Sequence, residues 1–304
     1  MNNCLVSVCL ITFNHEKYIK QAIESVLMQK VDFQFELVIA DDFSTDETRE
    51  ILLEYKSKFP NLIKLILQDK NVGAANNFCD LISYPKSKYI AYLEGDDFWT
   101  NPYKLQRQIS ILENSKDIVF CFHNAQYLNE NTRQFLDNYS NILFDREISL
   151  EEFLFKNYVP TASLVFEKKY FFPIPEWYKN IKYGDYALYL LILFRSNKKA
   201  YYLSDVMSVY RIHDNGSFSK LGDVDKALNY INLFTTFKKK VFKNKFNSYL
   251  NKIISFNYAQ LILLLFKQKA YFNSTYYFLL LFIKNPLYIY QKVLKIKKEL
   301  IRHQ

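Results

Sequence analysis

Tyr89-Ile-Ala-Tyr-Leu-Glu-Gly-Asp-Asp-Phe-Trp99 is the stretch of this sequence that says most about its fold. An apolar run, with the length and composition of a buried β-strand, ends abruptly in Glu94, Asp96 and Asp97. Carboxylates gathered at the end of a buried strand repel one another unless a cation lies between them. The stretch therefore predicts a metal site, although a strand that runs into a solvated acidic turn would give the same pattern.

A similar strand, followed by a helix, is predicted near the start of the chain. Residues 6–13, Val-Ser-Val-Cys-Leu-Ile-Thr-Phe, form an apolar run that stops at Asn14, a residue type suited to cap the next helix. That helix keeps its apolar residues at the spacing of an element packed against a sheet. These residues are Ile19, Ala22, Ile23, Val26 and Leu27.

A second strand is predicted at residues 35–40, and it ends in Asp41 and Asp42. Ser44 and Glu47 follow, three residues apart, in the pattern of a capping box that would start another helix. Alternating strands and helices are typical of an α/β fold. Each helix returns the chain to the end of the sheet where the strands begin, so that the next strand can run parallel to the previous one. We therefore predict a mostly parallel central sheet flanked by helices.

The carboxyl ends of these strands are where polar and aromatic residues gather in the sequence. Residues 63–67 form a third apolar run, and residues 71–77 lead into a short helix before the acidic strand. In open parallel sheets, ligands bind outside the carboxyl ends of the strands. Phe13, Asp42 and Asp96 stand at three such ends, so we expect one crevice to contain them.

The chain lacks the glycine-rich loops that bind phosphates directly. No Gly-x-Gly-x-x-Gly follows the first strand, and no Gly-Lys-Ser or Gly-Lys-Thr occurs. The phosphates of a ligand would therefore need a divalent cation, which the acidic strand could hold. We expect a nucleotide diphosphate in the crevice.

Several segments between residues 6 and 217 form a set of motifs. They are residues 6–14, 36–46, 71–73, 94–97 and 210–217, the last reading Tyr-Arg-Ile-His-Asp-Asn-Gly-Ser. In order and spacing this set resembles the family-two glycosyltransferases of bacterial surface-polysaccharide synthesis. The resemblance implies a GT-A fold, with a nucleotide-sugar half at residues 1–125 and an acceptor half at 126–224. A basic, apolar helical region at 225–304 would follow it.

The same resemblance implies a reaction and a cofactor. A sugar would move with inversion from a nucleotide-sugar, expected to be a UDP-hexose or UDP-N-acetylhexosamine, to a hydroxyl of a glycan or lipid-linked glycan. Mn²⁺ or Mg²⁺ is the implied cation, and surface polysaccharide or lipopolysaccharide is the implied product. The alternative is a binding module that keeps the GT-A fold and holds a nucleotide-sugar or glycan without catalysis.

The resemblance assigns the nucleotide-sugar site to the ends of the first strands. Phe13 would lie beside the base, and Asp42 would accept a hydrogen bond from it. The other residues assigned to this site are Thr12, Asn14, Asn71, Asp96 and Arg211. Phe13 could instead be a core aromatic residue, and Asp42 could be a turn or helix-cap acid.

The resemblance assigns the metal site to Asp96, Asp97 and His213. A neutral imidazole can complete the coordination shell of a metal ion. In the family, an Arg and a His at these positions close over the diphosphate, so Arg211 could neutralise the charge of this leaving group. Glu94 stands where many family members have the first Asp of the metal motif, so it would support the ligands without touching the ion. Outside such a motif, a lone loop histidine usually has no site role.

The general base is expected at Asp185. Inverting transfer needs a base that removes the acceptor's proton while the hydroxyl attacks the anomeric carbon. In the family this acid usually sits in a Glu-Asp pair before a helix, and here Gly184 replaces the Glu. Asp185 could instead serve only as the N-cap of the apolar helix at residues 186–194, where the helix dipole would lower its pKa.

The C-terminal region differs from the rest of the chain in charge. Residues 226–304 hold 15 of the 40 Lys and Arg and a single acid, Glu299, so their net charge is +14, whereas the preceding residues carry −5. Two apolar runs, 259–266 and 276–283, are separated by lysines, and neither approaches the roughly 20 residues that span a bilayer. Basic helices with apolar faces lie on anionic membrane surfaces, so we expect peripheral membrane contact.

Two alternatives for this region stay open. It could be a helical pair packed on the catalytic domain, or a basic arm that binds nucleic acid, although long leucine-rich runs would have no partner on RNA. The four cysteines have no metal-site spacing, which suits a reducing cytosol, and the first residues lack the features of a signal peptide. We expect a cytoplasmic protein on the inner face of a bacterial plasma membrane that binds no nucleic acid.

Overall fold

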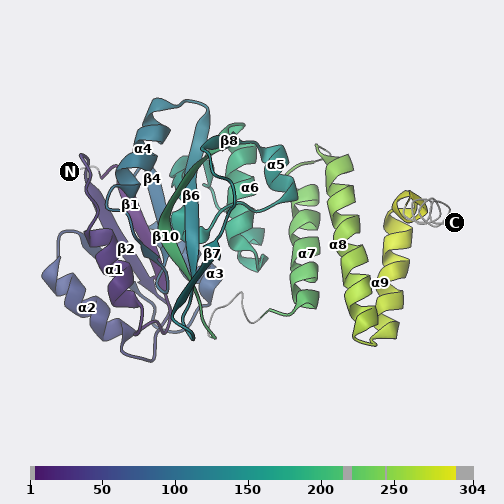
Figure 1. Cartoon of the computed structure of the whole chain (residues 1–304), viewed down its shortest axis with the longest axis horizontal. Helices are drawn as coiled ribbons and strands as arrows, with labels where there is room; N and C mark the ends of the chain where they lie inside the picture. The colour runs from purple at the N-terminus through teal and green to yellow at the C-terminus, as the bar shows by residue number, and fades with distance from the viewer. Residues whose placement is uncertain (1–3, 215–220, 244, 292–304) are drawn as a thin grey trace. The chain divides into compact units, whose positions relative to one another are not determined.

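The computed structural model describes residues 4–214, 221–243 and 245–291 of the chain (Figure 1). Residues 215–217, which end the last motif, lie outside the described residues, as do the last thirteen residues of the basic C-terminal region. The chain divides into two compact units. Unit 1 comprises Met1–Asn180 and Gly184–Gly216, and unit 2 comprises Ile181–Tyr183 and Ser217–Gln304.

Unit 1 is built on one mixed sheet with the strand order β3-β2-β1-β4-β9-β6-β10-β5, in which β7 also pairs with β6 and β8 with β10. Its first four strands in that order are parallel to one another, as the sequence predicts. The strands are β1 (Val6–Thr12), β2 (Phe35–Asp41), β3 (Ile63–Leu67), β4 (Tyr89–Glu94), β5 (Phe98–Trp99), β6 (Ile118–Asn129), β7 (Gln134–Asn138), β8 (Arg146–Ile148), β9 (Val165–Glu167) and β10 (Lys199–Ile212).

Helices flank this sheet (Figure 1). Those of unit 1 are α1 (Ile19–Leu27), α2 (Thr48–Lys58), α3 (Ala74–Ser83), α4 (Lys104–Asn114), α5 (Leu150–Phe155) and α6 (Gly184–Ser196), with short 3-10 turns at Thr161–Ser163, Lys168–Tyr170 and Glu176–Asn180. The apolar stripe predicted for α1 is confirmed, because four of its five residues are fully buried in a core that also contains apolar residues of β1, β2 and β4. Burying one such side chain contributes roughly 1.5–3 kcal/mol, so this contact fixes the helix on the parallel strands.

Both predicted helix starts after β1 and β2 are wrong. Asn14 does not cap α1, because the helix begins at Ile19, and the backbone of Asn14 is left-handed with φ 55°. The Oδ1 of Asn14 instead accepts a hydrogen bond from Thr45 N at 2.8 Å. Ser44 forms no capping box with Glu47, since its hydroxyl donates to Asp41 and accepts from Asn14 N. The two polar side chains therefore join the loops that follow β1 and β2.

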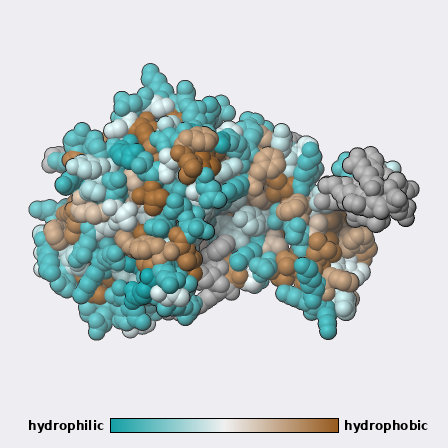
Figure 2. All heavy atoms as spheres, viewed as in Figure 1, coloured by the Kyte–Doolittle hydropathy of each residue, from teal (hydrophilic) through white to brown (hydrophobic). Residues whose placement is uncertain are grey.

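Unit 2 contains α7 (Asp223–Lys240), α8 (Asn247–Lys267) and α9 (Tyr271–Lys284). Tyr258, Leu261 and Leu265 of α8 form its core together with residues of α7 and α9. Among the described residues, α8 is the one helix long and apolar enough to cross a membrane by length and composition, and 28% of its most apolar window is buried. The first apolar run predicted from the sequence is thus part of a longer helix than expected. Figure 2 shows hydrophobic side chains on the surface of this part of the chain.

Candidate functional site

The acids predicted from the sequence lie where β4 ends and the chain turns into β5. Gly95 stands at this turn, and its N–H donates to the carbonyl of Ile11 at the end of β1 at 2.9 Å. A Cβ at Gly95 would come within 2.8 Å of both Thr12 Oγ1 and His15 Nδ1, which is closer than real Cβ contacts allow. A larger residue at position 95 would therefore force the side chains of Thr12 and His15 to move.

Asp96 and His213 lie together, as the sequence predicts. His213 Nε2 is 3.0 Å from Asp96 Oδ2, and His15 Nε2 is 3.9 Å from the same oxygen. His213 directly follows β10, and its ring packs against Tyr18 with 5.1 Å between the ring centroids. Sequence reasoning missed His15, although its place just beyond the first predicted strand was a usable signal.

Asp97 contacts β10, whereas Asp96 contacts the histidines. Its Oδ1 accepts a hydrogen bond from the backbone N–H of Arg211 at 2.8 Å, while its Oδ2 is buried without a hydrogen-bond partner. Leaving a charged oxygen unsatisfied in the interior is costly, so such an atom suits a ligand that neutralises it. No three His, Cys, Asp or Glu side chains within the described ranges are already arranged around a common metal position.

The guanidinium of Arg211 is occupied by protein groups. Its Nε donates to Glu130 Oε1 at 2.6 Å, and its two terminal nitrogens donate to the carbonyl of Asp96 and to Gln21. The side chains of Arg211 and Glu130 are only 4% and 7% exposed. The family resemblance predicts that Arg211 faces a diphosphate. In the structure, the three guanidinium nitrogens of Arg211 instead donate hydrogen bonds to protein groups.

The acids at the end of β4 form one electrostatic group that includes Asp185. Burial raises the pKa of Glu94 well above its usual value, and the charges of Asp96, Asp97 and Asp185 add to the effect. Burial and the neighbouring Asp96 likewise raise the pKa of Asp97. Burial raises the pKa of Asp96 too, but the hydrogen bond with His213 and the nearby charges of His15 and His213 together outweigh burial and lower this pKa. Burial and the neighbouring acids therefore oppose the ionisation of Glu94 and Asp97.

Asp185 lies in the first turn of α6, so it is not the N-cap that the sequence left open. Burial raises the pKa of its carboxyl, and hydrogen bonds from the Tyr186 backbone and the Asn157 side chain only partly offset this. The expectation that the helix dipole lowers this pKa is wrong, because loss of solvent has the larger effect. A carboxylate with a raised pKa is a stronger proton acceptor when it is ionised.

The ends of β1 and β2 carry the residues predicted to bind the nucleotide. Phe13 is 41% exposed and so is not a core aromatic residue. Asp42 is buried, and its Oδ1 accepts a hydrogen bond from Val72 N at 2.7 Å, while Asn71 Nδ2 donates to the Asp42 carbonyl at 3.2 Å. Sequence reasoning missed Phe43, which is 40% exposed. An aromatic residue directly after an Asp pair at a strand end could have indicated it.

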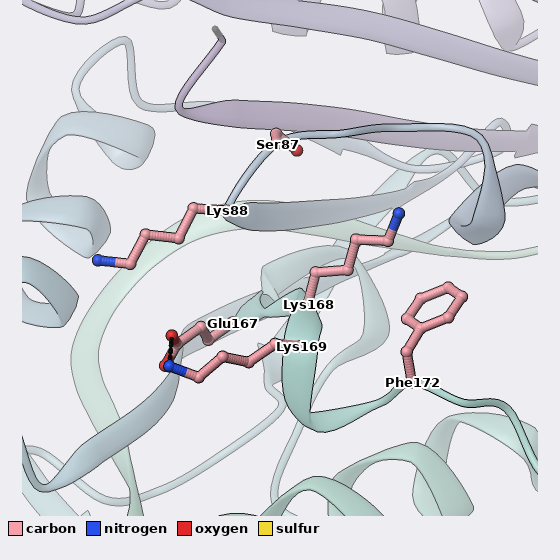
Figure 3. A pocket seen from close by; sticks show the side chains of 6 residues that line it. All are labelled: Ser87, Lys88, Glu167, Lys168, Lys169 and Phe172. Atoms are coloured by element: carbon pink, nitrogen blue, oxygen red, sulfur yellow. Dashed lines mark ion pairs between the residues drawn. The ribbon is translucent and has the colours of Figure 1, made fainter.

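A hollow at the other end of β4 does not belong to this site. Ser87, Lys88, Glu167, Lys168, Lys169 and Phe172 line it (Figure 3). Lys169 pairs with Glu167 at 2.5 Å, and Lys88 pairs with Glu113 at 2.8 Å. The lysine side chains point in different directions, so they do not converge on a common anion position.

Comparison with known proteins identifies the family. Residues 7–171 match the model of glycosyl transferase family 2, which is more than half of the chain. The chain belongs to this family. The match includes Asp42 and the acids after β4, but it ends before Asp185, Arg211 and His213.

Three known proteins show how far the similarity extends. An uncharacterized protein of Mycobacterium tuberculosis is 31% identical over 221 residues, which are 69% of this chain and 60% of that protein. The chain therefore spans about three-fifths of this relative's length. The Escherichia coli UDP-Glc:alpha-D-GlcNAc-diphosphoundecaprenol beta-1,3-glucosyltransferase WfgD is 28% identical over 212 residues, covering 70% of this chain and 79% of the enzyme.

A solved structure shows the fold. The mannosyltransferase PcManGT from Pyrobaculum calidifontis, in complex with GDP-Man and Mn²⁺, superposes with a TM-score of 0.60 and 14% identity, covering 94% of this chain and 88% of that one. The likeness confirms the predicted GT-A architecture, a central sheet flanked by helices with further helices at the C-terminus.

Proposed function

We propose that this chain transfers a sugar, with inversion, from a nucleotide-sugar to a hydroxyl of a glycan or lipid-linked glycan, in the synthesis of surface polysaccharide or lipopolysaccharide. One observation carries the proposal: the charges of Asp96, Asp97 and the half-buried Asp185 all act on the carboxyl of Glu94, in a chain of glycosyl transferase family 2. WfgD is named for transfer from UDP-Glc, which supports a UDP-sugar as the donor.

Asp185 is the proposed general base. Its carboxylate would accept the acceptor's hydroxyl proton as the oxygen attacks the anomeric carbon, while the nucleotide diphosphate leaves from the opposite face. Its raised pKa suits this role, because a base is most effective when its pKa approaches the working pH. The charge of Asp185 acts on Glu94 at the end of β4, which supports a donor site and a base that share one crevice.

The residues after β4 fit a divalent cation. Asp96 and His213 are 3.0 Å apart, and Asp97 Oδ2 is a buried carboxylate oxygen without a partner. Mn²⁺ or Mg²⁺ held by these three residues would neutralise the charge of the leaving diphosphate. PcManGT was solved with Mn²⁺, which supports the choice of cation.

The remaining donor contacts are proposed at the ends of β1 and β2. The exposed ring of Phe13 would lie against the base, and the buried carboxylate of Asp42 would accept a hydrogen bond from it. The exposed Phe43 offers a second ring at the same edge. Thr12, Asn14 and Asn71 would complete this side of the donor site.

A screen of nucleotide-sugars tests the proposal. UDP-Glc, UDP-GlcNAc and GDP-Man are incubated with the full chain and Mn²⁺ or EDTA, and the released nucleotide diphosphate is measured. We expect release from a UDP-sugar that requires Mn²⁺, and an anomeric configuration inverted in any glycosylated product. Gly184, in place of the usual Glu beside the base, favours a second candidate, a non-catalytic binding module. Donor binding without any release would support that module, and no binding of any donor would reject both.

We further propose that unit 2 holds the protein on the inner face of an anionic plasma membrane. Of the residues in α9 only Ser274 and Leu281 are buried, whereas its large apolar residues are widely exposed. The exposed ones are Tyr271, Phe272, Tyr276, Phe278, Leu279, Phe282 and Ile283. A helix that is apolar on its outer face as well needs an apolar partner on that side.

The charge of this region indicates which partner fits. Residues 226–304 carry +14, so a second copy docked on α9 would bring two strongly basic regions together. An anionic bilayer instead offers attraction of about 1 kcal/mol per nearby Lys or Arg and apolar chains for the exposed rings. The full chain should therefore sediment with phosphatidylglycerol vesicles at low salt and be partly released as salt rises. Absence from the vesicle pellet would reject this placement.

A further inference from the structure

The turn that carries Asp96 and Asp97 is held from two sides. On the β1 side, Gly95 N–H donates to the Ile11 carbonyl, and a Cβ at Gly95 would come within 2.8 Å of Thr12 Oγ1 and His15 Nδ1. On the β10 side, Arg211 contacts both acids: its backbone N–H donates to Asp97 Oδ1, and its guanidinium donates to the Asp96 carbonyl. The position of both acids therefore depends on where Arg211 is held.

The guanidinium of Arg211 is held by groups from three other segments. Glu130, directly after β6, accepts from Nε at 2.6 Å, and Gln21 of α1 accepts from one terminal nitrogen. The guanidinium also lies 5.1 Å from the ring centroid of Tyr18 and 4.5 Å from that of Phe98. A planar fork of donors between two rings is a geometry that lysine cannot reproduce.

Glu130 holds the guanidinium of Arg211 in place through a buried ion pair. Its side chain is 7% exposed, and its second carboxylate oxygen pairs with Arg133 at 2.9 Å. The backbone N–H of Glu130 donates to the Ile212 carbonyl at 3.0 Å. This hydrogen bond fixes the position of the end of β6 relative to the end of β10. His213 follows Ile212 directly, and the same pairing therefore also locates the histidine that contacts Asp96.

We infer that the buried Arg211–Glu130 ion pair is a positioning device that sets the Asp96–Asp97 turn and His213 for donor and cation binding, and that Arg211 acts on the donor through this turn. The inference rests on the proposed function for the identity of the ligand, but not for the geometry. Removing a group that orients metal-binding residues typically costs about 10- to 100-fold in metal affinity. A pair that served only general stability would leave the affinity of the folded protein unchanged.

Glu130→Gln and Arg211→Lys in the full chain test this inference. Glu130→Gln keeps the shape of the acceptor but removes its charge, and Arg211→Lys keeps the charge but loses the fork. Asp205→Asn is the matched control, because it breaks the exposed Arg107–Asp205 pair on the same strand without touching the turn. Gln21→Ala removes only the exposed acceptor on α1, so it should fold and show a smaller effect.

The first measurement needs no ligand. Amide hydrogen exchange should accelerate at residues 94–100 in Glu130→Gln and Arg211→Lys, while residues 48–67 and the control variant exchange as the parent does. Unchanged exchange at residues 94–100 in both variants would overturn the inference. Uniform acceleration over the whole chain would also overturn it, because the pair would then serve general stability.

The second measurement is calorimetric titration of UDP in the presence of Mn²⁺. We expect the affinity to fall about tenfold or more in Glu130→Gln and Arg211→Lys, and two- to threefold at most in Gln21→Ala. Parental affinity in both folded ion-pair variants would overturn the inference. If the parent itself bound no UDP, the proposal of a UDP-sugar donor would fail, and the exchange measurement would still decide whether the ion pair holds the turn.

Discussion

The two units of this chain differ in the sign of their clustered charges and in how much apolar surface they leave exposed. Unit 1 buries the apolar residues of its parallel strands and leaves an excess of acids where β4 ends. Unit 2 leaves large apolar side chains exposed along α9, and it contains residues 226–304, which hold 15 basic residues and one acid. The proposed ligands match these two surfaces: a cation with a phosphorylated donor at the acids of unit 1, and an anionic membrane at the basic, apolar surface of unit 2.

The largest effect is expected from removing charge at the acidic turn of unit 1. Asp97→Asn keeps the Oδ1 that accepts from Arg211 N but removes a carboxylate whose Oδ2 has no partner. Sugar transfer should fall to background, since the cation loses a charged ligand, while the free energy of unfolding stays equal or rises as repulsion is relieved. Turnover and urea denaturation measure the two, with Asp205→Asn as control. Turnover close to that of the parent, or in EDTA, would contradict a metal site here.

Asp185→Asn should have the next largest effect. Transfer should slow by roughly 10²- to 10⁴-fold, because the amide cannot accept the hydroxyl proton, whereas donor affinity should stay at the parental value. Steady-state rates with saturating acceptor and a separate donor titration separate these quantities. Parental transfer rates in the variant would show that Asp185 only starts α6.

The pH dependence gives the same residue a second test. In the proposed mechanism Asp185 acts as the ionised base, and burial raises its pKa. The transfer rate should therefore be highest above that pKa and fall as the pH drops through it. The loss should begin at a higher pH than for an exposed aspartate. This acidic limb of the rate profile should be absent from the residual activity of Asp185→Asn. An identical limb in the variant would assign it to another group.

The sequence predicts the parallel half of the fold and the acids well, because both are local patterns. An apolar run followed by acids identifies the end of β4, and helical spacing identifies the buried face of α1. The sequence does not predict β9, whose three residues are too few for periodicity yet lie between β4 and β6. It also misplaces the side chains of Asn14 and Ser44, since their partners come from another loop.

Long-range pairing explains the remaining differences at the site. Glu130 and Arg211 are 81 positions apart, so no local pattern indicates that they form a buried pair. The raised pKa of Asp185 depends on burial that only the assembled unit provides, whereas the helix dipole, a local effect, predicts the opposite direction. The sequence thus identified candidate groups, and the folded structure supplied their partners.

A smaller effect is expected from closing the tight approach at the acidic turn. Gly95→Ala places a Cβ within 2.8 Å of Thr12 Oγ1, whereas in Gly184→Ala the nearest atom, Tyr178 Oη, is 3.4 Å away. The first change should lower the free energy of unfolding by about 1–3 kcal/mol and weaken donor binding. The second should be neutral or stabilise α6 by up to roughly 1 kcal/mol, because alanine favours helix more than glycine does. Urea denaturation of both variants makes the comparison, and equal stabilities would show that the turn relaxes freely.

The smallest effect is expected from single changes on the outer face of unit 2. Phe272 is 87% exposed and Ile283 is 76% exposed, so replacing either by Ser should leave the free energy of unfolding nearly unchanged. Each change should nevertheless lower the vesicle-bound fraction several-fold, because burying one such side chain in lipid contributes about 1.5–3 kcal/mol. Leu143→Ser is the matched control, since Leu143 is 85% exposed in unit 1 and lies outside the proposed membrane face. Sedimentation with phosphatidylglycerol vesicles at constant salt compares the three variants.

If Leu143→Ser weakened binding as much as Phe272→Ser, the apolar contact would not be specific to α9. If none of the variants changed binding while added salt abolished it, charge alone would hold the protein on the membrane, and the exposed face of α9 would need another partner.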